Sequence, residues 1–230
     1  DATRIEKAGY KHFMAKEIAE QPVVIADALK HYTGTSGRLN LPQGLDFKGI
    51  DRVTLVACGT ASFACHVAKY WFEQVAGLPA DIDIASEFRY REPVLSPASM
   101  AIFVSQSGET ADTLAALRHV KDKVARVVSV VNVPTSSIAR ESDLALPILA
   151  GVEVGVASTK AFTCQLTTLA LMALKAAQDR GRIDAAQLND RLQSLRALPG
   201  LMNAALALSD PIARIAKDLA KAQDILFLGR

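Results

Sequence analysis

The sequence predicts an α/β fold: a three-layer α-β-α sandwich with a five-stranded parallel sheet, flavodoxin-like or Rossmann-like, plus helical appendages. Three observations predict it. Short, nearly continuous apolar runs, typical of buried parallel strands, alternate with stretches of helical periodicity. Polar turns follow the apolar runs, where parallel sheets bind their ligands. The 230 residues are 50% hydrophobic and 22% charged, which is ordinary for a globular protein.

The predicted elements alternate along the chain. The expected strands span residues 53–57, 82–85, 101–104, 126–133 and 144–149. The expected helices span residues 10–31, 61–75, 110–123, 159–178, 185–197 and 201–222. Pro22 is expected to break or kink the first helix, because proline removes a backbone donor and clashes with the preceding turn. Residues 33–49, rich in Gly, Pro and Ser, are expected to connect that helix to the first strand.

Bulk composition and charge exclude several classes of function. The net charge of +2 indicates neither nucleic-acid nor membrane binding. No apolar run approaches the roughly 20 residues of a membrane span, and the N-terminus does not resemble a signal peptide. The three cysteines form no CxxC pair, which indicates a reducing, cytoplasmic environment. The four histidines lack metal-ligand spacing, and we expect no metal and no other cofactor.

The most informative stretch is Ser105-Gln106-Ser107-Gly108-Glu109-Thr110, called the serine turn below, which joins a predicted strand to a predicted helix. A helix N-terminus offers free N–H groups and a positive dipole end, which favour an anion. The simpler interpretation is a helix cap, for which serine and threonine are preferred. Three hydroxyls and one amide exceed what a single helix end needs, so the turn predicts a phosphate site. Glu109 and Asp112 would repel a phosphate if they pointed at it.

Two further polar turns follow predicted strands. In Cys58-Gly59-Thr60 the glycine permits close approach of a ligand and the threonine offers a hydroxyl, although a plain strand-to-helix turn is an equally good interpretation. Residues 151–160 precede the long helix but lack the GxxxxGK[ST] order of a P-loop. The simpler interpretation there is that Ser158 or Thr159 caps the helix and that Lys160 is solvated. All three turns would meet at one edge of the sheet.

Other features carry less information. Cys58 is disfavoured as a nucleophile, because no histidine is close in sequence and buried structural thiols are commoner. No GxGxxG follows the first strand, which disfavours dinucleotide binding. Residues 87–92 combine charges with aromatic rings and predict a turn of helix at a surface or interface.

Taken together, these turns resemble the sugar isomerase (SIS) domain family, specifically the first of the two SIS domains of glucosamine-6-phosphate synthases. The motifs that carry the resemblance are, in order, Cys58-Gly59-Thr60, residues 85–91 (ASEFRYR), the serine turn, Asn132-Val133-Pro134 and residues 156–163 (VASTKAFT). The resemblance covers almost the whole chain. It implies a five-stranded parallel sheet between helices, in agreement with the pattern above.

The resemblance also implies which residues hold a sugar phosphate. Ser105, Gln106, Ser107 and Thr110 would hold the phosphate of fructose 6-phosphate. The sugar would be lined by Cys58, Gly59, Thr60, Val156 and Ser158. Ala61 departs from the family pattern, because close relatives often carry a serine after Cys-Gly-Thr.

The expected division of the chain follows from the same resemblance. We expect an N-terminal helix and connector (1–45), an SIS phosphosugar-binding domain (46–180), C-terminal helices (181–222) and the start of a second, missing SIS domain (223–230). Residues 224–229 support that start, because an aspartate, an apolar run and a glycine also occur in residues 51–59. The Schiff-base lysine, proton-transferring glutamate and ring-opening histidine of the family belong to its second SIS domain, and a glutaminase domain would precede residue 1. No catalytic residue is therefore expected in this chain.

We thus expect part of an aminotransferase that makes glucosamine 6-phosphate from fructose 6-phosphate and glutamine, with these 230 residues alone binding weakly and inactive. A homodimer is expected, driven by apolar residues 225–228. Three alternatives stay open: the phosphosugar-sensing SIS domain of a regulator, a flavodoxin-like flavin or nucleotide binder, and a structural fragment whose cradle is empty.

Overall fold

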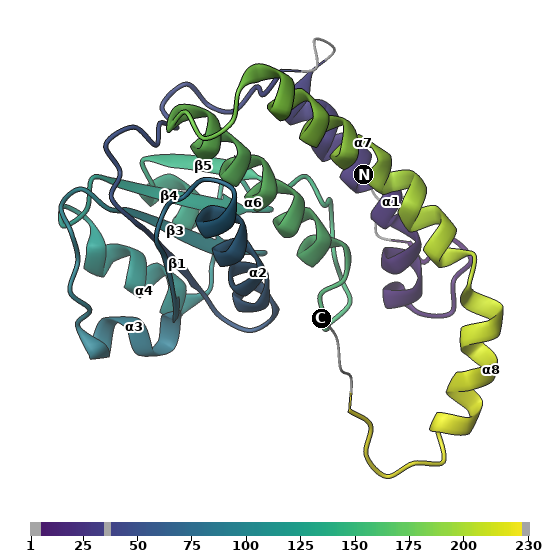
Figure 1. Ribbon diagram of the computed structural model, residues 1–230. Coiled ribbons are helices and arrows are strands. Elements are labelled where there is room, and N and C mark those ends of the chain that lie inside the picture. Colours follow the sequence, from purple (N-terminus) through teal and green to yellow (C-terminus); the bar gives the residue numbers. More distant parts are fainter. Residues whose placement is uncertain (1–5, 35–37, 227–230) are drawn as a thin grey trace.

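A five-stranded parallel sheet organises the computed structural model, which describes residues 6–34 and 38–226 (Figure 1). The strands are β1 (Val53–Ala57), β2 (Ala80–Ile84), β3 (Met100–Ser105), β4 (Arg126–Val131) and β5 (Leu144–Pro147). The helices are α1 (Phe13–Thr33), α2 (Thr60–Gln74), α3 (Ala85–Arg91), α4 (Ala111–Val120), α5 (Ser137–Glu141), α6 (Lys160–Asp179), α7 (Ala185–Leu206) and α8 (Ser209–Leu219).

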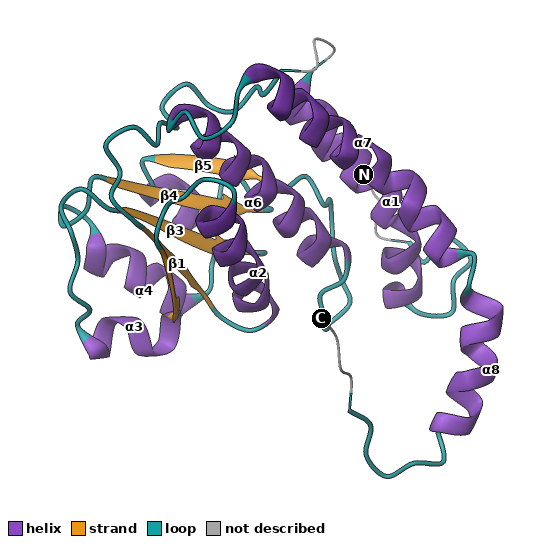
Figure 2. Ribbon diagram, in the orientation of Figure 1, coloured by secondary structure: helices purple, strands orange, loops and turns teal. Residues whose placement is uncertain are grey.

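The strand order is β2-β1-β3-β4-β5, and every neighbouring pair is parallel (Figure 2). The predicted α/β class with a five-stranded parallel sheet is confirmed. The chain leaves β1 toward β2 at one edge, crosses back to β3, and continues to β5 at the other edge. This reversal creates a topological switch point between β1 and β3, which is where sheets of this kind bind ligands.

Both faces of the sheet are covered by helices, because successive side chains of a strand point to opposite faces. In β1, Leu55 and Ala57 pack into a cluster with residues of α1, α2 and α6. Val56 packs into a second cluster, formed with α3, α4 and α5. All residues of β1 and β3 are buried, which explains why both strands read as continuous apolar runs rather than alternating ones.

Helix α1 packs against two other helices and is hydrogen-bonded to the edge strand β5. Helix α1 contacts both α6 and α7, and α7 runs along it in Figure 1. The Tyr32 hydroxyl at the end of α1 donates to the Pro147 carbonyl of β5 at 2.7 Å. These contacts hold α1 close to the chain that leads from β5 to α6, which becomes important for the site.

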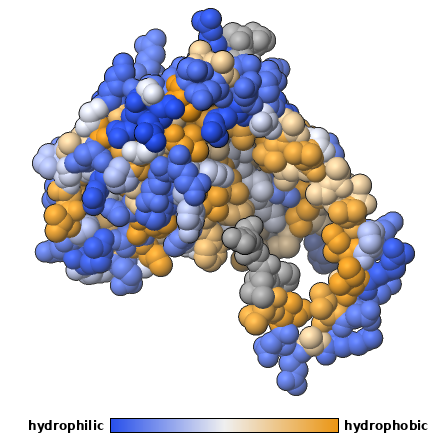
Figure 3. Space-filling view, in the orientation of Figure 1, coloured by the Kyte–Doolittle hydropathy of each residue, from blue (hydrophilic) through white to orange (hydrophobic). Residues whose placement is uncertain are grey.

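Helix α8 differs from the others, because none of its residues is buried against the described part of the chain. It projects away from the body of the molecule (Figure 1). Ile212, Ile215 and Leu219 lie along one side of it and remain exposed, as the apolar surface in Figure 3 shows. The helix therefore presents an apolar stripe to solvent.

Pro22 lies inside one helix that runs from Phe13 to Thr33, so the expected break does not occur. A proline at position 22 cannot donate to the carbonyl of Ile18. The Gln21 side chain supplies the missing donor, because its Nε2 lies 3.0 Å from the Ile18 carbonyl oxygen. The buried Pro22 therefore destabilises the helix less than the sequence pattern indicates.

The boundary expected near Pro199 is also wrong. Helix α7 runs through Pro199 and ends at Leu206, and α8 starts at Ser209. Contact with α1 and the packing of Leu198 and Met202 against the core hold α7 together across the proline. Tertiary packing here outweighs helix propensity.

Smaller differences concern short elements. The sequence pattern did not predict α5, which is only one turn of helix. Residues 224–226, where a strand was expected to begin, form no regular element, and residues 227–229 lie outside the described part. No helix in the described ranges is both long enough and apolar enough to cross a membrane.

Candidate functional site

The polar turns after β1 and β3 meet at the switch point of the sheet. Ala57 is paired with Val104, so Cys58 and Ser105 follow directly from aligned positions on neighbouring strands. The chain then turns toward opposite edges of the sheet, which leaves a hollow between the two turns. The 151–159 loop, which leads from β5 to α6, closes a third side of this hollow.

This hollow is a pocket of about 220 Å³. It brings together all the predicted binding residues except Gly59, which sets the turn but does not line the pocket. Its lining consists of Cys58, Thr60, Ala61, Val104, Ser105, Gln106, Ser107, Thr110, Thr113, Glu153, Gly155, Val156, Ser158 and Gln165. Thr113 and Gln165 were missed by the sequence analysis; both are buried and belong to helices, where nothing in the pattern separates them from core positions.

The hydroxyls of the serine turn brace its backbone and leave some of their protons available to a ligand. Ser105 Oγ accepts the Gly108 N–H at 3.1 Å, and Ser107 Oγ accepts the Glu109 N–H at 3.1 Å. Ser105 Oγ also lies 3.2 Å from Thr110 Oγ1, so one of these two hydroxyls donates to the other. The proton of the second hydroxyl of this pair and the Ser107 proton remain able to bond an anion. Thr110 is the N-cap of α4, but its side chain makes no capping bond. The helix-cap interpretation therefore does not account for these three hydroxyls.

The Glu109 carboxylate is directed away from the serine turn. Its Oε1 accepts the Ser137 backbone N–H at 2.7 Å, and this bond holds the pKa of Glu109 below its usual range. The negative charge is therefore engaged at the start of α5, outside the pocket lining. The repulsion that Glu109 would exert on a phosphate is avoided.

Gly108 is required by the shape of the turn. Its φ of +68° is a conformation that side chains rarely adopt, and a Cβ atom there would lie 2.0 Å from Ser136 Oγ and 2.5 Å from Ser136 Cβ. The Gly108 carbonyl also accepts the Ile138 N–H at 3.0 Å. The start of α5 thus packs directly against the turn and fixes its position.

The 151–159 loop is organised by Glu153. Its Oε1 accepts the backbone N–H groups of Thr159, at 2.8 Å, and Ala161, at 3.2 Å, while the Ser158 hydroxyl donates to Oε2 at 3.2 Å. Helix α6 is therefore capped by a carboxylate from the loop. The interpretation that Ser158 or Thr159 caps it is wrong, because the N-cap Thr159 makes no side-chain capping bond.

Lys160 is not solvated, contrary to the simpler expectation. The residue is 4% exposed, and its Nζ lies 2.7 Å from Glu20 Oε2 of α1. A buried lysine needs such a partner, since an unpaired charge in the interior is costly. Sequence distance hid the pairing, because 140 residues separate the two side chains.

The three cysteines differ in environment. Cys65 and Cys164 are fully buried, and burial raises the pKa of each thiol to about 12. Cys58 is partly exposed and lines the pocket. The described residues hold no group of three His, Cys, Asp or Glu side chains that could bind a metal ion.

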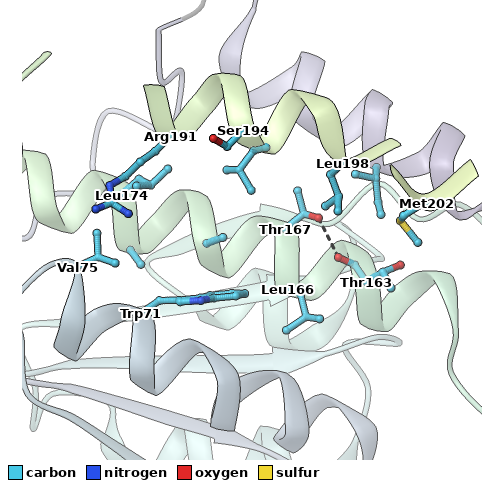
Figure 4. A pocket seen from close by; sticks show the side chains of 14 residues that line it. Trp71, Val75, Thr163, Leu166, Thr167, Leu174, Arg191, Ser194, Leu198 and Met202 are labelled. Carbon is cyan, nitrogen blue, oxygen red and sulfur yellow. Dashed lines mark hydrogen bonds between the residues drawn. The ribbon is translucent and has the colours of Figure 1, made fainter. Parts of the chain in front are cut away.

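A larger hollow of about 600 Å³ lies elsewhere, between α2, α6 and α7 (Figure 4). Apolar side chains such as Trp71, Leu166 and Leu198 line most of it. The hydroxyls of Thr163 and Thr167 donate to carbonyls of their own helix, at Lys160 and Thr163 respectively. Arg191 is the charged residue of its lining, and the mostly apolar wall suits a phosphate less than the hydroxyl-lined pocket does.

The sheet order and the serine turn define an α/β domain with a hydroxyl-lined pocket at its switch point. The chain belongs to the SIS domain family, whose model matches residues 47–175. It is 53% identical, over its whole length, to a glutamine–fructose-6-phosphate aminotransferase (isomerizing) of Bradyrhizobium diazoefficiens, but spans only 38% of that relative.

Solved structures agree with this assignment. The C-terminal domain of glucosamine-fructose-6-phosphate aminotransferase from Francisella tularensis superposes with a TM-score of 0.93 at 40% identity, covering 98% of this chain and 64% of that one. A putative phosphosugar isomerase from Clostridium difficile shares the fold, with a TM-score of 0.73 at 17% identity, covering 89% of this chain and 57% of that one. The predicted resemblance is confirmed.

We predict that Gly108→Ala lowers the free energy of unfolding. Backbone strain at this φ costs about 1–3 kcal/mol, and the steric overlap of the new Cβ with Ser136 increases the loss further. Urea denaturation measures the change. Gly200→Ala is the matched control, because a Cβ there meets nothing within 4 Å and alanine in a helix is favoured by about 0.5–1 kcal/mol. Adding Ser136→Gly to Gly108→Ala should recover part of the loss. An unchanged urea midpoint for Gly108→Ala would contradict the described turn.

Proposed function

We propose that this chain binds fructose 6-phosphate at the pocket between β1 and β3. The phosphate contacts Ser105, Gln106, Ser107 and Thr110, and the sugar contacts Cys58, Gly59, Thr60, Val156 and Ser158. One observation carries the proposal: three hydroxyls stand at the N-terminus of α4, and none is used to cap that helix. Gly59 contributes through its φ of +57°, which turns the chain after β1 toward α2.

Neutral donors suit this ligand. Backbone N–H groups at a helix start and serine hydroxyls hold an anion without a fixed opposing charge. The exocyclic phosphate of a sugar would thus be held at one end while the loop residues contact the hydroxyls. The full enzyme would make glucosamine 6-phosphate from fructose 6-phosphate and glutamine. The name of the relative, glutamine–fructose-6-phosphate aminotransferase (isomerizing), supports these two substrates.

The affinity of the pocket is tested by removing hydroxyls. We expect Ser105→Ala/Ser107→Ala to weaken binding of fructose 6-phosphate at least about tenfold, because a bond to a charged group contributes about 1.5–3 kcal/mol and 1.4 kcal/mol is tenfold. Thr110→Val should also weaken binding without loss of helix α4, since its hydroxyl makes no capping bond. Titration calorimetry measures each affinity.

Ser194→Ala is the control for these variants, because Ser194 is exposed on α7, away from the pocket. Equal affinity in the wild type and the double variant would remove the phosphate-cradle proposal. A parallel titration with FMN separates this proposal from a flavodoxin-like flavin binder. Preferential binding of FMN would favour that alternative.

The chemistry of the full enzyme is expected to need residues outside this chain. The lining of the pocket is neutral except for Glu153, and that carboxylate accepts bonds from Thr159, Ala161 and Ser158. Aldose–ketose isomerisation needs a positioned acid and base, and imine formation needs a nucleophilic amine. We therefore expect the 230 residues to produce no glucosamine 6-phosphate from fructose 6-phosphate and glutamine or ammonia. Product assays beside a full-length relative test this, and measurable synthesis by the chain alone would refute it.

We further propose a homodimer in the cytoplasm. The exposed apolar stripe of α8, together with Ile225 and Leu226, supports self-association, since such surface is usually covered. Sedimentation of the chain should give a dimer, and Ile215→Glu should shift it toward the monomer. A monomer at all concentrations would contradict the proposal. A regulatory phosphosugar sensor stays the second candidate function.

A further inference from the structure

The Glu17 carboxylate of α1 is buried beside the 151–159 loop. The residue is 2% exposed. Its Oε1 accepts the Val154 N–H at 2.6 Å and the Gly155 N–H at 3.1 Å, and its Oε2 lies 3.2 Å from the same Gly155 nitrogen. A buried carboxylate is tolerated where such donors meet it. Here the donors belong to the loop that closes the pocket.

The contact with Glu17 leaves no space for a side chain at Gly155. A Cβ atom at position 155 would lie 2.5 Å from Glu17 Oε2, so any larger residue would push the carboxylate away from the loop. The contact in its present form leaves no room for a Cβ at position 155, and the φ there is not an unusual one. The two residues form one contact, which a change on either side would break.

A second contact joins the same two segments. Glu20, one turn along α1 from Glu17, pairs with Lys160 at 2.7 Å and with Lys16 at 3.6 Å. Lys160 is the first residue of α6, where the loop ends. Helix α1 therefore holds the loop near its middle through Glu17 and at its end through Glu20.

Packing does not hold Val156, one of the two loop residues that would meet the sugar. The Val156 side chain is fully exposed, and Ser158 contacts Glu153 within the loop itself. The bonds from Val154 and Gly155 to Glu17 thus fix the backbone just before Val156. Glu17 is outside the pocket lining and would not touch the ligand.

We infer that Glu17 is a positioning residue: its bonds to Val154 and Gly155 hold Val156 and Ser158 where they contact the sugar. The inference rests on the proposed function, which makes this loop the sugar side of the pocket. The serine turn is braced separately, by Ser136 and Ile138. Loss of Glu17 should therefore affect recognition of the sugar and leave recognition of the phosphate intact.

The test compares two ligands on the same variants. By NMR titration, Glu17→Gln should weaken binding of fructose 6-phosphate about tenfold, while inorganic phosphate binds within twofold of the wild type. Gly155→Ala should do the same, and the double variant should be no weaker than either single one, because both changes break one contact. Asp27→Asn is the matched control, an exposed acid on the same helix.

A measurement without ligand accompanies the titrations. Amide hydrogen exchange at Val154 and Gly155 should be at least tenfold faster in Glu17→Gln, with Gly108 and Glu109 within twofold of the wild type. Unchanged exchange, or unchanged affinity for fructose 6-phosphate, would overturn the inference. Equal weakening of both ligands would also overturn it, because it would show a general structural role. If the wild type binds neither ligand, the proposed function fails, and hydrogen exchange alone decides whether Glu17 holds the loop.

Discussion

Parallel pairing of β1 with β3 is the constraint on which the site depends. Because Ala57 and Val104 are aligned, the residues that follow them emerge side by side. Because the chain then turns to opposite edges of the sheet, neither turn covers the other. The hollow at the strand ends is thus a result of the sheet topology. The residues of the two turns determine only which polar groups line it.

Three carboxylates near this hollow are engaged by backbone N–H groups. Glu109 accepts from the start of α5, Glu153 caps α6, and Glu17 holds the loop from behind. Some hydroxyl protons of the serine turn are left to bond a ligand. On the side of the serine turn an anion would therefore meet neutral donors, while the Glu153 carboxylate on the loop side already has its own donors.

The sequence predicts the parts of this fold whose signals are local. The apolar run of β1, the apolar run of β3 and the serine turn are each a pattern within a few consecutive residues, so the sequence identified both the sheet and the pocket. Long-range contacts were invisible to that reasoning. Lys160 was expected to be solvated because its partner Glu20 lies 140 residues away. Pro22 was expected to break or kink its helix because proline lacks a backbone donor. The sequence pattern could not show that the Gln21 side chain replaces this donor, since the bond depends on side-chain geometry. Nothing in the sequence distinguishes Glu17 from other acidic residues on a helix, because its partners Val154 and Gly155 are distant along the chain.

The different burial of the cysteines has a practical consequence. Two thiols are enclosed in the core and are protonated at neutral pH, since their pKa is raised to about 12. The third, Cys58, lines the pocket and is partly exposed. The native sequence therefore carries its own attachment point for a fluorophore or spin label, beside the position where the ligand would sit and without any engineered residue.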